Sequence, residues 1–219
     1  MARDWFRSTE WTPEVEAEFD VRLQRARKYK RPQYLRVQGV TLKRAGDVET
    51  ARELWLRVLD EEDNSESASA LEHLADSWTL EDPARAIDYY RTMLAKFPDL
   101  KSTSFTAPIK FAELLLDRGG PSDIVEADAA LAFPLGIAPL PDMDFRRQVA
   151  LARLGRIRGD NAAVRSAAQT ALELAAKGPI FTYHPNVGLV DTDAKTLQQL
   201  RRLVRFPRLA PIPQLTTRG

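Results

Sequence analysis

The chain has 219 residues, 44% of them apolar and 29% charged, and its formal net charge is +1. Such a composition can bury a core, and it excludes both a disordered chain and a strong overall field toward nucleic acid or membranes. The chain has no cysteine, which excludes disulfides and thiolate chemistry. No segment has the roughly 18 to 20 apolar residues of a membrane span, and the charged start is unlike a signal peptide. We therefore expect a soluble cytoplasmic protein with no membrane partner.

The first predicted helix covers residues 13–29. Thr12 followed by Pro13 is typical of a helix start, and Val15, Phe19 and Leu23 follow at helical spacing. Residues 1–31 thus form an N-terminal aromatic segment and a capping helix. Large aromatic side chains are costly to leave in water, so we expect three of them to pack back on the first helices: Trp5, Phe6 and Trp11.

Residues 32–177 are predicted to form a series of helices joined by short turns. Gly46-Asp47 and Gly159-Asp160 provide the same kind of turn twice. The proline-rich segment 134–141 cannot be helical and marks a break. The predicted helices are 32–45, 48–60, 66–80, 83–97, 105–118, 121–133, 142–158 and 161–177.

Residues 178–219 are predicted to form a loop, a capping helix from Asp191 to about Val204, and a proline-rich tail from Phe206. No acidic residue follows Asp193. The cations of this end are compatible with phosphate contacts or with a solubilising helix end, and few aromatic residues lie among them, so we do not expect nucleic acid as a partner. They are Lys195, Arg201, Arg202, Arg205, Arg208 and Arg218.

A helix-pair pattern occurs twice, in segments 32–63 and 67–98. Ala51 and Ala86 lie 35 positions apart, and an aromatic residue follows each by four positions. A period near 34 residues with this pattern is typical of a helix–turn–helix array. Such arrays usually bind other proteins and rarely perform chemistry.

This pattern resembles the tetratricopeptide repeat, which has a small residue at position 8, alanine at 20, an aromatic residue at 24 and proline near 32. The match is good over residues 32–98 and loose over 105–177. The opening segment also resembles uncharacterised bacterial proteins with such repeats. The resemblance implies an all-α fold, a right-handed α-solenoid of antiparallel helix pairs. The matching residues are Gly39, Ala51 and Trp55 in the first repeat and Ala86, Tyr90 and Pro98 in the second.

The resemblance also implies a concave groove lined by repeat positions 2, 5, 9 and 12. In this chain such a groove is basic at both ends and apolar in the middle, which suits an acidic peptide or an amphipathic helix of a partner protein. The alternative is that the charges belong to solvated helix faces. Val40 and Ala75 replace the asparagines with which the family grips a terminal carboxylate, which argues against that ligand. The candidate partner-binding residues are Arg36, Val40, Lys43, Arg44, Leu71, Trp78, Arg146, Arg153 and Arg156.

The sequence contains no motif that indicates catalysis, a metal or a cofactor. A phosphate-binding loop, a nucleophile elbow and an HExxH motif are all missing. We expect His73 to pack in the core and His184 to lie in a loop without a second ligand nearby. The leading interpretation is a non-enzymatic adaptor without cofactors. The alternatives are a self-assembling scaffold subunit, which segment 134–141 and the N-terminal aromatics suggest, and a nucleic-acid-associated regulator.

Overall fold

The computed structural model describes residues 4–61, 64–134 and 140–213, and these residues form helices, turns and loops without any strand. The chain divides into two compact units, Met1–Ser104 (unit 1) and Phe105–Gly219 (unit 2). Neighbouring helices pack in contact within each unit, which confirms the predicted all-α class. Among the described helices, none has the length and apolar character that crossing a membrane requires.

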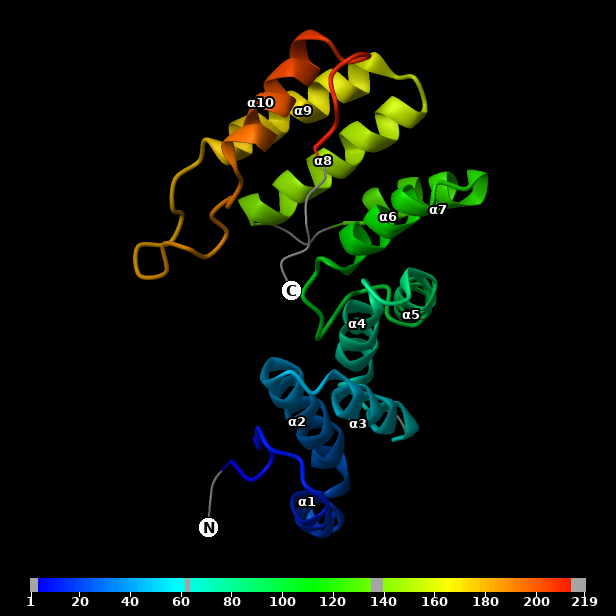
Figure 1. Cartoon of the computed structure of the whole chain (residues 1–219), viewed down its shortest axis with the longest axis vertical. Helices are drawn as coiled ribbons and strands as arrows, with labels where there is room; N and C mark the ends of the chain where they lie inside the picture. Colours follow the sequence, from blue (N-terminus) through cyan, green and yellow to red (C-terminus); the bar gives the residue numbers. More distant parts are fainter. Residues whose placement is uncertain (1–3, 62–63, 135–139, 214–219) are drawn as a thin grey trace. The chain divides into compact units, whose positions relative to one another are not determined.

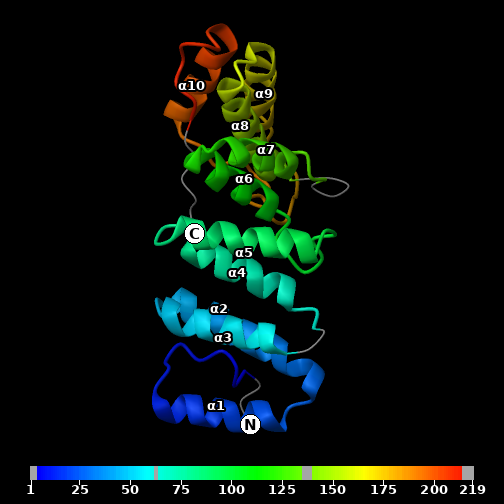
Figure 2. The ribbon, with the colours of Figure 1, turned by 90° about the vertical axis from the view of Figure 1, so that its right-hand side faces the viewer.

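Unit 1 is built from helices that pack each against the next along the chain (Figure 1, Figure 2). Its elements are α1 (Pro13–Arg25), η1 (Lys28–Lys30), α2 (Arg31–Ala45), α3 (Val48–Asp60), α4 (Ser67–Trp78) and α5 (Pro83–Lys96). Local capping explains most of the bounds. The side chains of Thr12, Asp47 and Asp82 accept hydrogen bonds from backbone N–H groups in the first turns of α1, α3 and α5.

The first helix ends four residues before the predicted position. Ala26 leaves the helix with an extended backbone, and η1 follows. The Arg31 guanidinium donates hydrogen bonds to the carbonyl oxygens of Gln24 and Ala26, at 2.7 and 3.2 Å. It thereby satisfies backbone acceptors at the end of α1 that a continued helix would otherwise have used.

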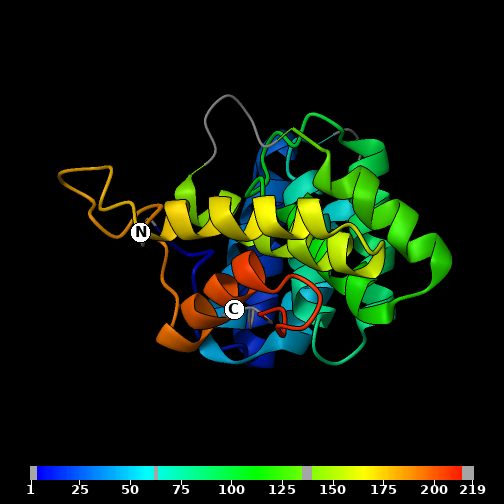
Figure 3. The same cartoon turned by 90° about the horizontal axis from the view of Figure 1, so that it is seen from above.

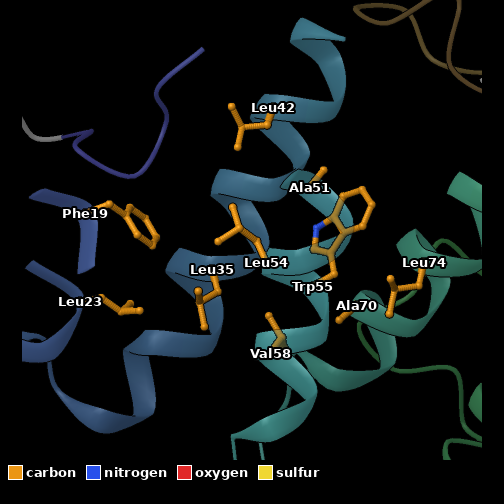
Figure 4. Packing of buried hydrophobic residues seen from close by; sticks show 10 residues of the cluster. All are labelled: Phe19, Leu23, Leu35, Leu42, Ala51, Leu54, Trp55, Val58, Ala70 and Leu74. Atoms are coloured by element: carbon orange, nitrogen blue, oxygen red, sulfur yellow. The ribbon is translucent and has the colours of Figure 1, made fainter. Parts of the chain in front are cut away.

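The core of unit 1 depends on a close approach of α2 and α3. Trp55 is fully buried, and a Cβ atom on Gly39 would lie 2.5 Å from its Nε1 atom. The same Nε1 donates a hydrogen bond to the Arg36 carbonyl oxygen at 3.3 Å. Trp55 also contacts α4, because its ring packs on His73 of that helix with centroids 5.1 Å apart. Figure 4 shows Trp55 between α2 and the residues Ala70 and Leu74 of α4.

The N-terminal segment packs back on α1 and α2, as predicted. The Trp5 ring contacts the rings of Phe19 and Tyr34, and Trp11 also contacts Phe19. The buried amide of Gln38 fixes the backbone here, because it accepts from Ser8 N–H at 3.0 Å and donates to the Ser8 carbonyl at 2.7 Å. One buried side chain therefore ties the segment to α2.

Unit 2 has two groups of packed helices. Its elements are α6 (Ala107–Arg118), α7 (Pro121–Leu131), α8 (Pro141–Ile157), α9 (Asn161–Ala175) and α10 (Ala194–Arg205). α6 packs on α7 and α8, and α9 lies between α8 and α10 (Figure 3). The two predicted Gly-Asp turns are alike: Gly46 and Gly159 are left-handed, and the following aspartates cap α3 and α9.

The helices α8 and α10 begin at other residues than predicted. α8 begins at Pro141, one residue before the predicted start, and Leu140 is at its N-cap. α10 begins at Ala194, because the Asp193 carboxylate accepts from Thr196 N–H at 2.6 Å. That hydrogen bond also lowers the pKa of Asp193. Within segment 134–141, residues 135–139 lie outside the described residues.

The proline-rich end, where it is described, packs on unit 2 and is not a free tail. Pro207, Ala210 and Pro213 are buried, and Ala210 belongs to the cluster that contains Leu200 and Leu203. The Arg156 guanidinium donates to the Ala210 carbonyl oxygen at 2.6 Å. Apolar side chains at every third position allow this segment to cover the end of the unit.

We predict that Gly39→Ala destabilises unit 1, although the helix propensity of alanine is more favourable than that of glycine by about 1 kcal/mol. The new Cβ must displace a buried indole ring, and such overpacking costs about 1 to 3 kcal/mol. Urea denaturation followed by circular dichroism measures the difference. The control is Gly178→Ala, where a Cβ meets no atom within 4 Å. Equal stability of the two variants would contradict the role given to this contact.

Candidate partner-binding surface

The first group of candidates lies on α2, where Arg36, Val40 and Lys43 follow at helical spacing and Arg44 lies beside them. Arg36 forms an ion pair with Glu66, the residue at the N-cap of α4. Lys43 is half-buried and Arg44 is exposed in the last turn of α2. Among the described residues, neither side chain has a hydrogen bond or an ion pair. These two cations are therefore available to a ligand, whereas Arg36 ties α2 to α4.

The second group, the apolar middle of the expected groove, is not an open surface. Leu71 is only 4% exposed, and Ala68 and Ala75 are buried as well. The physical reason is that α4 packs against α3 and α5, and the segment after α5 also reaches it. Ser104 N–H donates to a carboxylate oxygen of Glu72 at 2.8 Å. The prediction that Leu71 offers its side chain to a partner is thus wrong for this structure.

Trp78 is partly exposed, but cations of unit 1 cover its ring. The guanidinium carbons of Arg52 and Arg85 lie 3.4 and 4.3 Å from the ring centroid. Arg52 is buried and is held in place by Ser77 and Glu81. The indole therefore completes a cation–π arrangement at the end of α4 instead of presenting an open apolar anchor.

The third group, on α8, holds neighbouring parts of unit 2. Arg146 forms a two-bond ion pair with Glu113 of α6, with Nε 2.7 Å from Oε1. Arg153 pairs with Asp117, one turn further along α6. Arg156 donates to the Ala210 carbonyl, as described above. All three arginines thus have partners within unit 2, a role that neither sequence interpretation predicted.

The ion pairs recur at a separation close to one repeat length. Sequence analysis missed this regularity, although a carboxylate about 30 to 37 residues from each arginine was the available signal. The pairs that join successive parts of the chain include Asp20–Arg57, Arg36–Glu66, Arg52–Glu81, Glu113–Arg146, Asp117–Arg153 and Asp128–Arg158. Cations at regular positions therefore follow from the packing of one helix pair on the next, before any ligand is considered.

A hollow of about 340 Å³ lies in unit 2, lined by residues of α7, α8 and α9. Leu151, Leu154 and Ala167 contribute to its lining, and so do the paired side chains of Arg158 and Asp128. Its lining includes no histidine and no cysteine, the usual side chains of nucleophilic or metal chemistry. In the ranges that the structure describes, no group of three or more His, Asp or Glu side chains is arranged to hold a metal ion.

The remaining expectations concern the histidines and the N-terminal aromatics. His73 packs on Trp55, as predicted, and His184 is exposed in its loop. Trp5, Phe6 and Trp11 are partly buried and pack against the core of unit 1.

Comparison with known proteins identifies no relative. No family model, no curated protein and no solved structure matches the chain.

We predict that the Arg146–Glu113 pair couples more strongly than the Arg158–Asp128 pair. The first pair is mostly buried, with side-chain exposures of 21% and 13%, whereas the second is 43% and 48% exposed. Double-mutant cycles with Arg→Met and Glu→Gln or Asp→Asn should give a coupling free energy of about 1 to 3 kcal/mol for the first pair and below about 1 kcal/mol for the second. The reverse order would show that burial does not determine how strongly these ion pairs stabilise unit 2.

Proposed function

We propose that this protein is a non-enzymatic interaction adaptor of the tetratricopeptide-repeat type, which binds an acidic or amphipathic segment of another protein. The support from the fold is the way its helices pair. Short turns reverse the chain between α2 and α3 and between α8 and α9. At each pair a glycine, Gly39 or Gly155, lies against the facing helix. Arrays of such pairs present extended surfaces and characteristically bind peptides.

The observation that carries the proposal is the pair of available cations at the end of α2. Lys43 and Arg44 are the candidate cations to which the described residues provide neither a carboxylate nor a carbonyl, whereas Arg36, Arg146 and Arg153 each pair with a carboxylate and Arg156 donates to the Ala210 carbonyl. The side chain of Val40 lies one turn before Lys43 and is partly exposed. Two cations beside an apolar side chain suit a segment that combines carboxylates with an apolar residue. The proposed site is therefore Val40, Lys43 and Arg44.

The packing of the other candidates supports this smaller site. Replacing Arg36, Arg146 or Arg153 would break an internal ion pair, so a loss of binding would not distinguish contact from misfolding. Lys43 and Arg44 lack such pairs, and their replacement tests binding directly. Their place in the last turn of α2 gives them a favourable interaction with the helix dipole, which any control must reproduce.

We predict that Lys43→Glu with Arg44→Glu abolishes retention of a partner protein in affinity capture from the native lysate, read out by mass spectrometry. Charge reversal at the site turns attraction of an acidic segment into repulsion. The matched control is Arg25→Glu with Arg27→Glu, exposed cations at the last residue of α1 and two residues beyond it. Thermal unfolding of both variants checks that the fold is kept.

Two outcomes would contradict the proposal. Retention of the same proteins by the wild type and the Lys43/Arg44 variant would show that α2 is not the binding surface. Capture of the chain itself alone, together with concentration-dependent sedimentation, would favour the self-assembling scaffold instead.

A further inference from the structure

The four arginines at the end of α10 are unlike those of the rest of the molecule. Arg201, Arg202 and Arg205 are exposed on the helix, and Arg208 follows in the next turn. Over the part of the chain that the structure describes, none of the four forms an ion pair or a side-chain hydrogen bond. By contrast, arginines on α2, α3 and α8 hold carboxylates of neighbouring helices. The charge at this end of unit 2 is therefore not used in stabilising the fold by ion pairs.

These cations lie on a helix that is anchored to its neighbours in unit 2. Leu200 and Leu203 bury the opposite side of α10 against α9, and Arg165 of α9 donates to the Val204 carbonyl at 3.0 Å. The segment after the helix is held by the bond from Arg156 to Ala210. We call the exposed residues Lys195, Arg201, Arg202 and Arg205 the cationic face of α10. Because the apolar side of α10 and the segment after it are anchored, the exposed face keeps its arrangement when it meets a charged surface.

An exposed apolar loop lies at the N-terminal end of α10. Residues 178–190 leave α9, extend away from the helices and return to α10 (Figure 1, Figure 3). Tyr183 is 92% exposed. Three more apolar side chains of this loop, Ile180, Phe181 and Val187, are exposed as well, and no acidic residue occurs between positions 174 and 190. Exposed apolar side chains gathered in one place usually mark a contact surface.

The base of this apolar loop is pinned to unit 2. Gly188 is left-handed and lies against Leu140 and Pro141, and its carbonyl accepts from Asp142 N–H at 3.2 Å. Two turn hydrogen bonds, His184 N–H to the Phe181 carbonyl and Val187 N–H to the His184 carbonyl, shape its tip. The loop is therefore held by backbone contacts at its base and within its tip.

A second exposed apolar pair lies at the other end of α10. Phe206 is 58% exposed and Leu209 is 85% exposed, and they alternate with Arg205 and Arg208. A helix of 12 residues is about 18 Å long, so apolar contacts at both ends flank the cationic face over this length. Two carboxylates, Asp191 and Asp193, lie near the loop end of the helix. Asp193 caps α10, and six cations between positions 177 and 213 exceed these two charges.

The geometry points to peripheral docking of unit 2 on an anionic lipid surface, with the cationic face of α10 against the headgroups and the apolar loop in the interface. Lipid headgroups attract clustered Lys and Arg, and Tyr and Phe side chains favour the membrane interface. A nucleic acid would use the same arginines but has no use for Ile180, Val187 and Leu209, so the apolar side chains favour lipid. Sequence analysis predicted no membrane partner, because the net charge of the whole chain is close to zero and no segment is apolar enough to span a membrane. Neither criterion detects a local group of cations beside exposed apolar side chains.

The test is co-sedimentation of the full chain with phosphatidylcholine vesicles that contain or lack phosphatidylglycerol. We expect binding only to the anionic vesicles, weakened by salt. Each basic residue near such a surface contributes about fivefold to partitioning, so Arg201→Gln, Arg202→Gln and Arg205→Gln together should weaken it about 100-fold. The control Arg25→Gln with Arg27→Gln, on unit 1, should leave binding within about twofold.

The apolar loop is tested separately. Phe181→Ser with Tyr183→Ser should weaken binding also at high salt, because the apolar contribution is not screened. Tyr29→Ser, an exposed tyrosine of unit 1, is its control. Equal binding to neutral and anionic vesicles, no binding to either, or equal effects of the variants and their controls would overturn the proposal. Salt-sensitive binding to a single-stranded oligonucleotide without binding to vesicles would assign the face to nucleic acid instead.

Discussion

The close approach of α2 and α3 at Gly39 is the contact on which the arrangement of unit 1 depends. Because glycine has no Cβ, the Trp55 ring can lie directly on the α2 backbone, where its N–H bonds to the Arg36 carbonyl. The same ring packs on His73, so one aromatic side chain fixes the positions of three helices. The position of α4 in turn brings Glu66 to Arg36. A small residue facing a large one thus determines which charges meet.

The same dependence of charge contacts on helix packing explains why several cations expected in the binding groove form ion pairs within the chain. In an array, each helix pair contacts only its neighbours, so every interface between pairs needs its own stabilising contacts. Arginines at regular repeat positions provide them when a carboxylate lies about one repeat away, as with Arg146 and Glu113. The sequence shows the cation and not which face of the helix its partner occupies. The same pattern therefore fits a ligand site and a structural ladder equally well.

What the sequence predicted well was decided locally. The Gly46-Asp47 turn and the Asp82 cap act within a few residues, and the bounds of α3 and α5 agree with prediction to within one residue. What it missed depends on contacts between distant residues. The burial of Leu71 accompanies the packing of Ser104 on Glu72, and the order of the C-terminal segment depends on Arg156 reaching Ala210. Periodicity within one helix contains no information about such contacts.

A comparison of α1 with α10 indicates that solubility alone does not explain the charge on α10. A solvated helix face needs polar side chains, but the sign of their charge is free. α1 exposes charges of both signs, since Glu14, Glu16 and Glu18 are exposed on it and so is Arg25. The charged side chains exposed on α10 are instead all cations, and apolar side chains are exposed near both ends of this helix. Charges of mixed sign would keep α10 solvated equally well. An exposed apolar side chain such as Leu209 makes solvation less favourable. A single sign of charge flanked by apolar contacts is what an anionic, partly apolar surface requires.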